Sequence, residues 1–325
     1  MRIQILGGGG FIGLKLAKAL AERGTLRGET ISHLCLADVT NTNAIDAPFP
    51  VSTHAIDIAD RNAVDALMEK GWDGIFHLAA VVSGQAEAEF VSGLRANFFG
   101  TLNVFESARA SGRKPMIVYS SSVAAYGGEV PQPIEDWTNT NPQTSYGSQK
   151  VIGELLLNDY SRKGFVDGRG VRLPTVVVRP GKPNAAASSF FSSIIREPLQ
   201  GTPAMCPVDP NATKGWLTSP RAVVDNLLRT AELDAKSLGQ NRCFNLPGIT
   251  VTVAEMIEAL GRKGGQGALD LVDYDRDATV EKIVSGWAVD FKPAKALALG
   301  MEADTDFDSI VQQFIDDELG GRIAV

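Results

Sequence analysis

The chain has 325 residues, of which 44% are hydrophobic and 21% charged, and its formal net charge is −7. This length predicts one large α/β domain with an added lobe, or two domains. The negative charge argues against a nucleic-acid or anionic-membrane partner, because such a partner would be repelled, and no apolar run approaches the roughly 18 residues of a membrane helix. A small-molecule ligand is therefore the expected partner.

The three cysteines, Cys35, Cys206 and Cys243, are scattered and odd in number. We expect buried thiols in a reducing compartment rather than a disulfide framework. The chain opens with the strand-like segment RIQIL and has no basic segment followed by a long apolar stretch, so no export signal is predicted. These features predict a cytoplasmic protein.

Strands and helices are expected to alternate through the first half of the chain. The predicted strands lie at 2–6, 31–39, 51–58, 74–82, 115–122 and 175–180. The predicted helices lie at 11–24, 60–71, 86–111 and 145–162. The strands contain consecutive Val, Ile and Leu rather than strict alternation, which is typical of a parallel sheet covered on both faces. The fold class expected is a doubly wound α/β (Rossmann) sheet.

The composition of the sequence changes after Pro180, where Gly, Pro, Ser and Asn become frequent. We expect a nucleotide-binding domain over 1–180 and a smaller mixed α/β lobe over 181–325. Segments near 216–248 are expected to return to the first domain. Helices are expected in the lobe near 188–197, 252–265 and 306–321.

Gly7, Gly10 and Gly13 follow the first predicted strand and open the first predicted helix, with Phe11 and Ile12 between the last two. Glycines in this pattern allow a tight turn and a close approach of the backbone to a pyrophosphate, which the helix N-terminus then binds. A merely flexible turn is the alternative. The strand before and the helix after favour a dinucleotide site.

Asp38 ends the second predicted strand. A carboxylate there accepts hydrogen bonds from the adenosine ribose and repels a 2′-phosphate, and no Arg or Lys follows it in VTNTN. NAD is therefore expected rather than NADP, although a solvated aspartate would look the same in sequence. Asp57 and Ile58, after the third predicted strand, are expected beside the adenine.

Tyr146 and Lys150 are four residues apart on a predicted helix, so both side chains lie on one face. A free tyrosine has a pKa near 10, and a nearby ammonium group and an oxidised nicotinamide would both favour the phenolate. The segment VYSSSVAAYG (118–127) leaves a strand at the carboxyl edge of the sheet, where such folds bind ligands. One of its serines is expected beside Tyr146.

The ordered motifs GGGGFIG, Asp38, DI (57–58), HLAA (77–80), NFFGT (97–101), SSSVAAYG, YGSQK and VVRP resemble the extended short-chain dehydrogenase/reductase family over residues 1 to 180. The resemblance implies that Tyr146 is the catalytic acid/base and that Lys150 binds the nicotinamide ribose. It also implies Ser122 as the partner of the substrate oxygen and Asn97 as a support of the proton path. Leu78, Ala79 and Ala80 would lie along the cofactor.

The segment after the last of these motifs reads RPGKPNAAASSFF, with Lys182 where the family's epimerases have Asn, and without their Tyr-Gly-Pro. A lysine there would pair with a carboxylate. This region is similar to the sugar-acid dehydrogenases of the family, which oxidise the C2 hydroxyl of D-erythronate to the 2-oxo acid by NAD-dependent hydride transfer. That resemblance makes Ser122 and Tyr146 ligands of the C2 oxygen. Lys182, Asn184 and either Ser83 or Lys214 would hold the carboxylate and the other hydroxyls.

A nucleotide-sugar epimerase or dehydrogenase and a uronate dehydrogenase are the alternative functions, and a non-catalytic NAD-sensing protein is a more distant one. A zinc site is not expected, since the histidines are far apart and no cysteine pair occurs. The helices predicted at 86–111 and 145–162 could pair with their copies in a homodimer, as in the family, or could simply cover the sheet.

Overall fold

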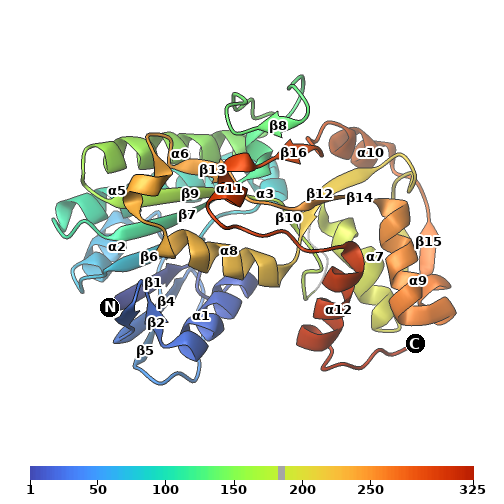
Figure 1. The fold of residues 1–325 in the computed structure, drawn as a ribbon, viewed down its shortest axis with the longest axis horizontal. Helices are drawn as coiled ribbons and strands as arrows, with labels where there is room; N and C mark the ends of the chain where they lie inside the picture. Colours follow the sequence, from blue (N-terminus) through green and yellow to red (C-terminus); the bar gives the residue numbers. More distant parts are fainter. Residues whose placement is uncertain (182–186) are drawn as a thin grey trace.

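A seven-stranded parallel sheet lies at the centre of the computed structural model, which describes residues 1–181 and 187–325 (Figure 1). Its strand order is β13-β9-β7-β6-β1-β4-β5. The strands are β1 (Arg2–Leu6), β4 (His33–Asp38), β5 (Val51–Ala55), β6 (Gly74–His77), β7 (Met116–Ser122), β9 (Asp167–Leu173) and β13 (Cys243–Asn245). The chain moves outward from β1 to β5 and then returns to β6 on the other side, so the order reverses beside β1. This confirms the doubly wound fold and sets a ligand-binding edge at the carboxyl ends of β1 and β6.

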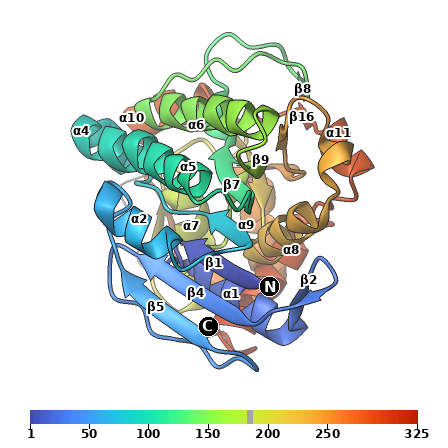
Figure 2. The same cartoon turned by 90° about the vertical axis from the view of Figure 1, so that its left-hand side faces the viewer.

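Helices cover both faces of the sheet, as Figure 2 shows. One face carries α1 (Phe11–Arg23) and α8 (Pro220–Glu232), and the other carries α2 (Arg61–Met68), α5 (Thr101–Ala110) and α6 (Ser145–Arg162). Asp60 caps α2 by accepting hydrogen bonds from the backbone N–H groups of Asn62 and Ala63. The strands between these layers are buried on both faces, because their apolar side chains pack against the helices on either side of the sheet.

The prediction that residues 175–180 form a strand of the main sheet is wrong. Thr175–Val176 form a short strand, β10, that pairs with β12 outside the main sheet. The strand beside β7 is instead β9, which contains the buried residues Arg169 and Arg172. Charged residues are rarely buried unless paired, so this segment does not look like a core strand in sequence.

The single helix predicted over 86–111 is also wrong, because this stretch is divided into four pieces. They are α3 (Ser83–Ala88), α4 (Phe90–Gly93), a π-helical segment η1 (Leu94–Gly100) and α5. A π-helical segment shifts the register of the helix face, so the residues before and after it point in different directions than one straight helix would allow.

The second half of the chain builds a lobe beside the sheet (Figure 1). Its strands are β10, β11 (Ala204–Cys206), β12 (Lys214–Thr218), β14 (Ile249–Thr252) and β15 (Val272–Tyr274). Its helices are α7 (Ser189–Leu199), α9 (Val253–Leu269), α10 (Ala278–Ser285) and α12 (Phe307–Glu318). The lobe has its own core, which includes Phe191, Leu217, Met256 and Ile310.

Three connections bind the lobe to the sheet. α8 packs against α1, and β13 pairs with β9 at the edge of the main sheet. The short strands β8 (Ile134–Glu135) and β16 (Phe291–Lys292) pair with each other between the two parts. The remaining elements are β2 (Thr25–Leu26), β3 (Glu29–Thr30), α11 (Ala294–Ala298) and two short 3₁₀ turns, η2 (Val123–Ala125) and η3 (Ala235–Leu238). The domain boundary at residue 180 stays a prediction.

All three cysteines are buried, as predicted, and they are free thiols. Within residues 1–181 and 187–325, no helix has the length and apolar character needed to cross a membrane.

Candidate active site

The glycine loop between β1 and α1 is closely packed. Gly7 has φ +84°, and a Cβ built on it would lie 2.7 Å from the backbone N of Ala79. A Cβ on Gly13 would lie 2.2 Å from the carbonyl oxygen of Gly7. Gly10 caps α1 with its backbone and has no side chain over the helix end. The loop therefore needs glycine for its own geometry and leaves a helix N-terminus open to a phosphate group.

Asp38 lies where β4 ends, beside this loop. Its Oδ2 accepts a hydrogen bond of 2.9 Å from the backbone N–H of Gly9. The carboxylate is thus held next to the loop, in the position where an adenosine ribose is bound in this fold. The residues present fit a dinucleotide, because the glycine loop leaves the backbone accessible and the carboxylate is held beside it.

The preference for NAD should depend on the charge of Asp38. Replacing Asp38 with Ser should increase the affinity for NADPH relative to NADH by about tenfold or more, because the group that repels the 2′-phosphate is lost. Fluorescence titration with both reduced cofactors measures this ratio. Asp57→Ser is the control, since both cofactors share the adenine, and its ratio should stay within about twofold. An unchanged ratio in the Asp38 variant would contradict the assignment.

The other residues predicted for the cofactor surround the same edge of the sheet. Asp57 is exposed, while Ile58 is buried and contacts the backbone of the helix region at Gly100. Leu78, Ala79 and Ala80 follow β6 and are half-buried, and Ala79 contacts Gly7 across the loop. Phe11 and Ile12 begin α1, and both are half-buried.

Tyr146 lies in the first turn of α6, which Thr144 caps by accepting a hydrogen bond of 3.0 Å from the N–H of Gly147. Ser122, the last residue of β7, has its side chain close enough to the phenol of Tyr146 to lower the pKa of that phenol. Its Oγ also accepts a hydrogen bond of 3.1 Å from the N–H of Ala124. The structure therefore brings together the serine and the tyrosine that the sequence predicted as partners.

Lys150 lies one turn after Tyr146 and is almost completely buried. Its Nζ donates a hydrogen bond of 2.7 Å to the carbonyl oxygen of Ser120 and lies 5.6 Å from the ring centre of Tyr146. The ammonium group and the phenol are therefore on one helix face, as the spacing predicted.

A lysine neighbour alone would be expected to lower the pKa of Tyr146. In the chain by itself, the pKa of Tyr146 is instead raised. Burial raises the pKa of Tyr146 to about 12, and the nearby side chain of Ser122 only partly opposes this. Burial also lowers the pKa of Lys150 to about 7, while the carboxylate of Glu154 acts in the other direction. Both shifts have the same cause, because burial disfavours each charged form. A phenolate at this position therefore needs additional positive charge nearby.

Asn97 lies in the π-helical segment and is buried. Its Oδ1 accepts a hydrogen bond of 2.8 Å from the N–H of Val81, and its Nδ2 donates to the carbonyl of Val81 at 3.0 Å and to Oε1 of Gln149 at 2.8 Å. Asn97 thus joins the loop after β6 to the residue next to Lys150. Ser83 follows this loop as the first residue of α3 and is half-buried.

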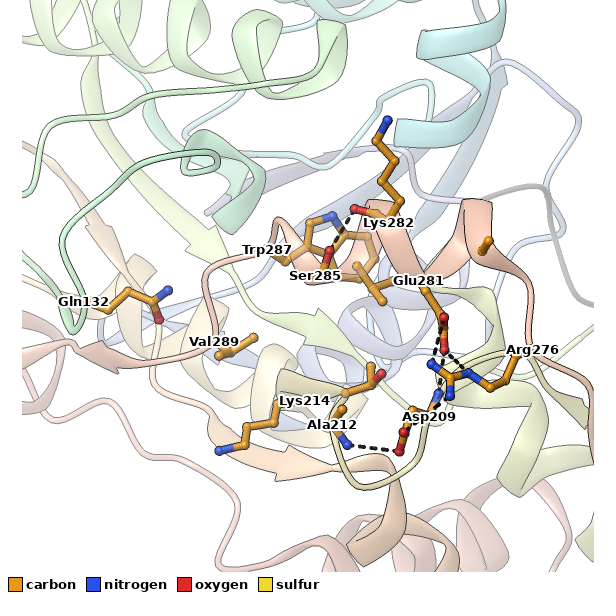
Figure 3. Close-up of a pocket in the computed structure, with 13 residues that line it drawn as sticks. Gln132, Asp209, Ala212, Lys214, Arg276, Glu281, Lys282, Ser285, Trp287 and Val289 are labelled. Atoms are coloured by element: carbon orange, nitrogen blue, oxygen red, sulfur yellow. Dashed lines mark hydrogen bonds and ion pairs between the residues drawn. The ribbon is translucent and has the colours of Figure 1, made fainter.

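Within the residues that the structure describes, no substrate residue predicted in the lobe is brought next to Ser122 and Tyr146. Lys182 and Asn184 lie outside the described residues. Lys214 lines a pocket of about 520 Å³ in the lobe, between α10 and β12 (Figure 3). Ser122, Tyr146 and Lys150 do not line this pocket, and the amino groups of Lys214 and Lys282 point to different sides rather than toward one point. The pocket is therefore not the site that Tyr146 and Ser122 form.

Sequence reasoning missed a buried ion pair beside this site. Glu154 lies one turn after Lys150 and binds Arg172 of β9 through two hydrogen bonds. The sequence feature that could have indicated Glu154 is its position four residues after Lys150, on the same helix face. Its partner could not be found from sequence because β9 was not recognised as a core strand.

The glycine loop at the point of strand reversal, with a serine, a tyrosine and a lysine at the sheet edge, is the arrangement expected of an NAD-dependent oxidoreductase with a Rossmann fold. The family model described as the NAD dependent epimerase/dehydratase family matches residues 3–217. The chain belongs to this family, which is the extended short-chain dehydrogenase/reductase family expected from its motifs, and its cofactor is NAD.

Two relatives are similar over nearly their whole length. A protein of Cupriavidus necator named D-erythronate dehydrogenase is 49% identical over 322 residues, 98% of each chain. A protein of Haemophilus influenzae with the same name is 42% identical over 316 residues, 97% of this chain and 99% of the other.

Solved structures are also similar. One described as the nucleoside-diphosphate-sugar epimerase from Agrobacterium tumefaciens has a TM-score of 0.94 at 43% identity, covering 99% of this chain and 95% of that one. The holo form of a GalE-like L-threonine dehydrogenase from Cupriavidus necator has a TM-score of 0.84 at 24% identity, covering 98% and 100%, and shows the shared fold.

Proposed function

We propose that this protein is an NAD-dependent dehydrogenase of small sugar acids that oxidises the C2 hydroxyl of D-erythronate to the 2-oxo acid. The observation that carries the proposal is the 49% identity to a relative of that name over 98% of both chains. The glycine loop, Asp38 and the Ser122, Tyr146 and Lys150 group support it, because these residues match the needs of alcohol oxidation. Its place would be in sugar-acid metabolism.

In this proposal the chain's own residues bind the alcohol and move its proton. Ser122 and Tyr146 hold the C2 oxygen, and Tyr146 removes the hydroxyl proton as a general base. Lys150 stabilises the phenolate by its charge and binds the nicotinamide ribose, while Asn97 supports the proton path. Bound NAD supplies the hydride acceptor. Ser83, Lys182 and Asn184 are proposed to hold the carboxylate and the remaining hydroxyls.

A spectrophotometric panel tests the proposal. The protein is mixed with NAD and with D-erythronate, related aldonates, uronates or UDP-hexoses, and the formation of NADH is followed. We expect NADH formation with D-erythronate or a near aldonate. Activity on UDP-hexoses without activity on any aldonate would overturn the proposal.

The second candidate function is a nucleotide-sugar epimerase, because the Agrobacterium structure at 43% identity carries that description. An epimerase returns its cofactor to the oxidised state, so it would interconvert UDP-hexoses without net NADH. Chromatographic analysis of the UDP-hexose arm of the panel separates the two functions, since an epimerised product would favour the second candidate.

We also propose a homodimer formed through α6 and the segments beside it. Large apolar side chains are exposed on these neighbouring elements: Phe90 and Val91 on α4, Phe99 on η1, and Ile152 and Leu155 on α6. Exposed apolar groups gathered on adjacent helices are typical of a protein interface. A second copy of the chain is the proposed occupant, in keeping with dimers in the family.

Replacing Leu155, which is 65% exposed, with Asp should convert the dimer to a monomer, because a charge would be buried at the interface. Sedimentation velocity at several protein concentrations measures the change. Leu297→Asp is the control, since Leu297 is 54% exposed on α11, which is not one of the elements of the proposed interface, and its variant should remain dimeric. A wild-type protein that sediments as a monomer would contradict the proposal.

A further inference from the structure

A row of polar residues crosses three strands below the proposed catalytic group. Ser121, Arg172 and Asn245 are direct neighbours in the register of β7, β9 and β13. Glu154 of α6 lies over this row and is 3% exposed. Its Oε1 accepts hydrogen bonds from Nε of Arg172 at 2.8 Å and from Oγ of Ser121 at 2.5 Å, and its Oε2 accepts one from Nη2 of Arg172 at 2.5 Å. Both carboxylate oxygens are thus used in a bidentate pair.

Arg172 also binds the far end of the turn that contains Ser122. Its Nη1 donates a hydrogen bond of 2.6 Å to the hydroxyl of Tyr126, and its guanidinium carbon lies 5.2 Å from the centre of the Tyr126 ring. Ser121 precedes Ser122 and Tyr126 follows the 3₁₀ turn that Ser122 caps. The ion pair therefore holds the residues on both sides of Ser122.

The same carboxylate acts on Lys150, one turn earlier in α6. Lys150 is 2% exposed, and its Nζ donates to the carbonyl of Ser120 rather than to a carboxylate of the residues that the structure describes. Glu154 is the group whose charge favours the ammonium form of Lys150. One buried residue therefore influences both the serine and the lysine beside Tyr146.

We propose that Glu154 and Arg172 are positioning residues of the active site, whose buried ion pair holds the residues on both sides of Ser122 and so keeps Ser122 beside Tyr146. The proposal rests on the roles proposed above for Ser122, Tyr146 and Lys150. The alternative is that the pair only stabilises the fold, as buried pairs elsewhere in the chain do. Removing one partner of any buried pair lowers stability because it leaves an uncompensated charge, so stability alone does not separate the two roles.

The charged and titratable groups around Lys150 and the Glu154–Arg172 pair determine how a substitution changes the pKa values of the site. Lys150 faces Tyr146 and Glu154 on its own helix, Tyr119 on β7 and His77 on β6. Glu154 faces Arg172 on β9, Ser121 on β7 and Cys243 on β13, and Arg172 also faces Tyr126 and Asn245. Among these groups, Glu154 is the one that carries a negative carboxylate. Its loss should make Lys150 lose its proton at lower pH, which in turn should make the phenolate of Tyr146 form at higher pH.

The test compares three proteins with the wild type. Glu154→Gln removes the charge, and Glu154→Leu combined with Arg172→Met replaces the pair by apolar groups and avoids an unpaired charge. Asp167→Asn is the matched control, because Asp167 pairs with the buried Arg169 at the other end of β9. For each protein we measure melting temperature, affinity for NADH, kcat and KM with the substrate found in the panel, and the pH dependence of kcat.

We expect both Glu154 variants to bind NADH within about twofold of wild type but to have kcat reduced about tenfold or more. The acid limb of their kcat profile should move to higher pH by about half a pH unit or more. Asp167→Asn should lose stability but keep kcat and its pH profile. Folded Glu154 variants with wild-type kcat and pH profile would overturn the proposal.

A second measurement needs no substrate and so separates this proposal from the proposed function. Tyrosinate formation is followed by ultraviolet difference titration with NAD bound, comparing each protein with its Tyr146→Phe counterpart. The step assigned to Tyr146 should occur at higher pH in the Glu154 variants than in wild type. If it does so while D-erythronate is not oxidised, the positioning role stands and the substrate assignment fails. An unmoved step would overturn the positioning role.

Discussion

Replacing Tyr146 with Phe should reduce the rate of NADH formation with D-erythronate to about a hundredth of the wild-type rate or less, because positioned acid/base catalysis contributes roughly 10² to 10⁴. The substitution keeps the ring in its packing and removes the hydroxyl that lies beside Ser122. Steady-state kinetics under saturating NAD measures the loss. The affinity for NADH should change little, since the glycine loop and Asp38 are untouched.

Tyr274→Phe is the control for this substitution. Tyr274 is 60% exposed on β15 in the lobe, so removing its hydroxyl should leave kcat within about twofold of wild type. A Tyr146→Phe protein that retained more than about a tenth of the wild-type kcat would show that another group removes the proton.

Replacing Gly13 with Ala should weaken NADH binding about tenfold or more. The added Cβ would lie 2.2 Å from the carbonyl oxygen of Gly7, and this neighbour is backbone, so the loop between β1 and α1 must move. A displaced loop no longer presents its N–H groups and the start of α1 to a pyrophosphate. Fluorescence titration with NADH measures the affinity, and the melting temperature should also fall.

Gly267→Ala is the matched control within a helix. A Cβ on Gly267 would meet only the side chain of Val325, at an ordinary contact distance of 3.5 Å. Its NADH affinity should therefore equal that of wild type within about twofold. If Gly13→Ala also bound NADH as tightly as wild type, the glycine loop would not be the pyrophosphate site.

The burial of Lys150 and the partial burial of Tyr146 explain why the site needs several supports. Burial raises the pKa of Tyr146 and lowers that of Lys150, so a phenolate and an ammonium group are each disfavoured in isolation. In the proposed mechanism the phenolate and the ammonium group stabilise each other, and the carboxylate of Glu154 also favours the ammonium form of Lys150. The same low exposure that opposes ionisation strengthens each of these interactions once it is formed.

The features that sequence alone determined are local in the chain. The glycine spacing and the strand and helix around it predicted the loop, and the four-residue spacing predicted that Tyr146 and Lys150 share a helix face. Asp38 was recognised because it ends a strand directly after the loop and helix. In each case the interacting residues lie within one strand-helix-strand unit, whose geometry follows from its own backbone periodicity.

The tertiary structure alone decided which distant segments meet. Arg169 and Arg172 are atypical of a core strand. They are buried because carboxylates from their own strand and from α6 pair with them, and because further oxygen atoms accept their hydrogen bonds. The long helix expected over 86–111 is interrupted by the π-helical segment, where Asn97 binds the loop after β6. These contacts depend on strand order and packing between segments far apart in the chain, which the local pattern of apolar and polar residues does not specify.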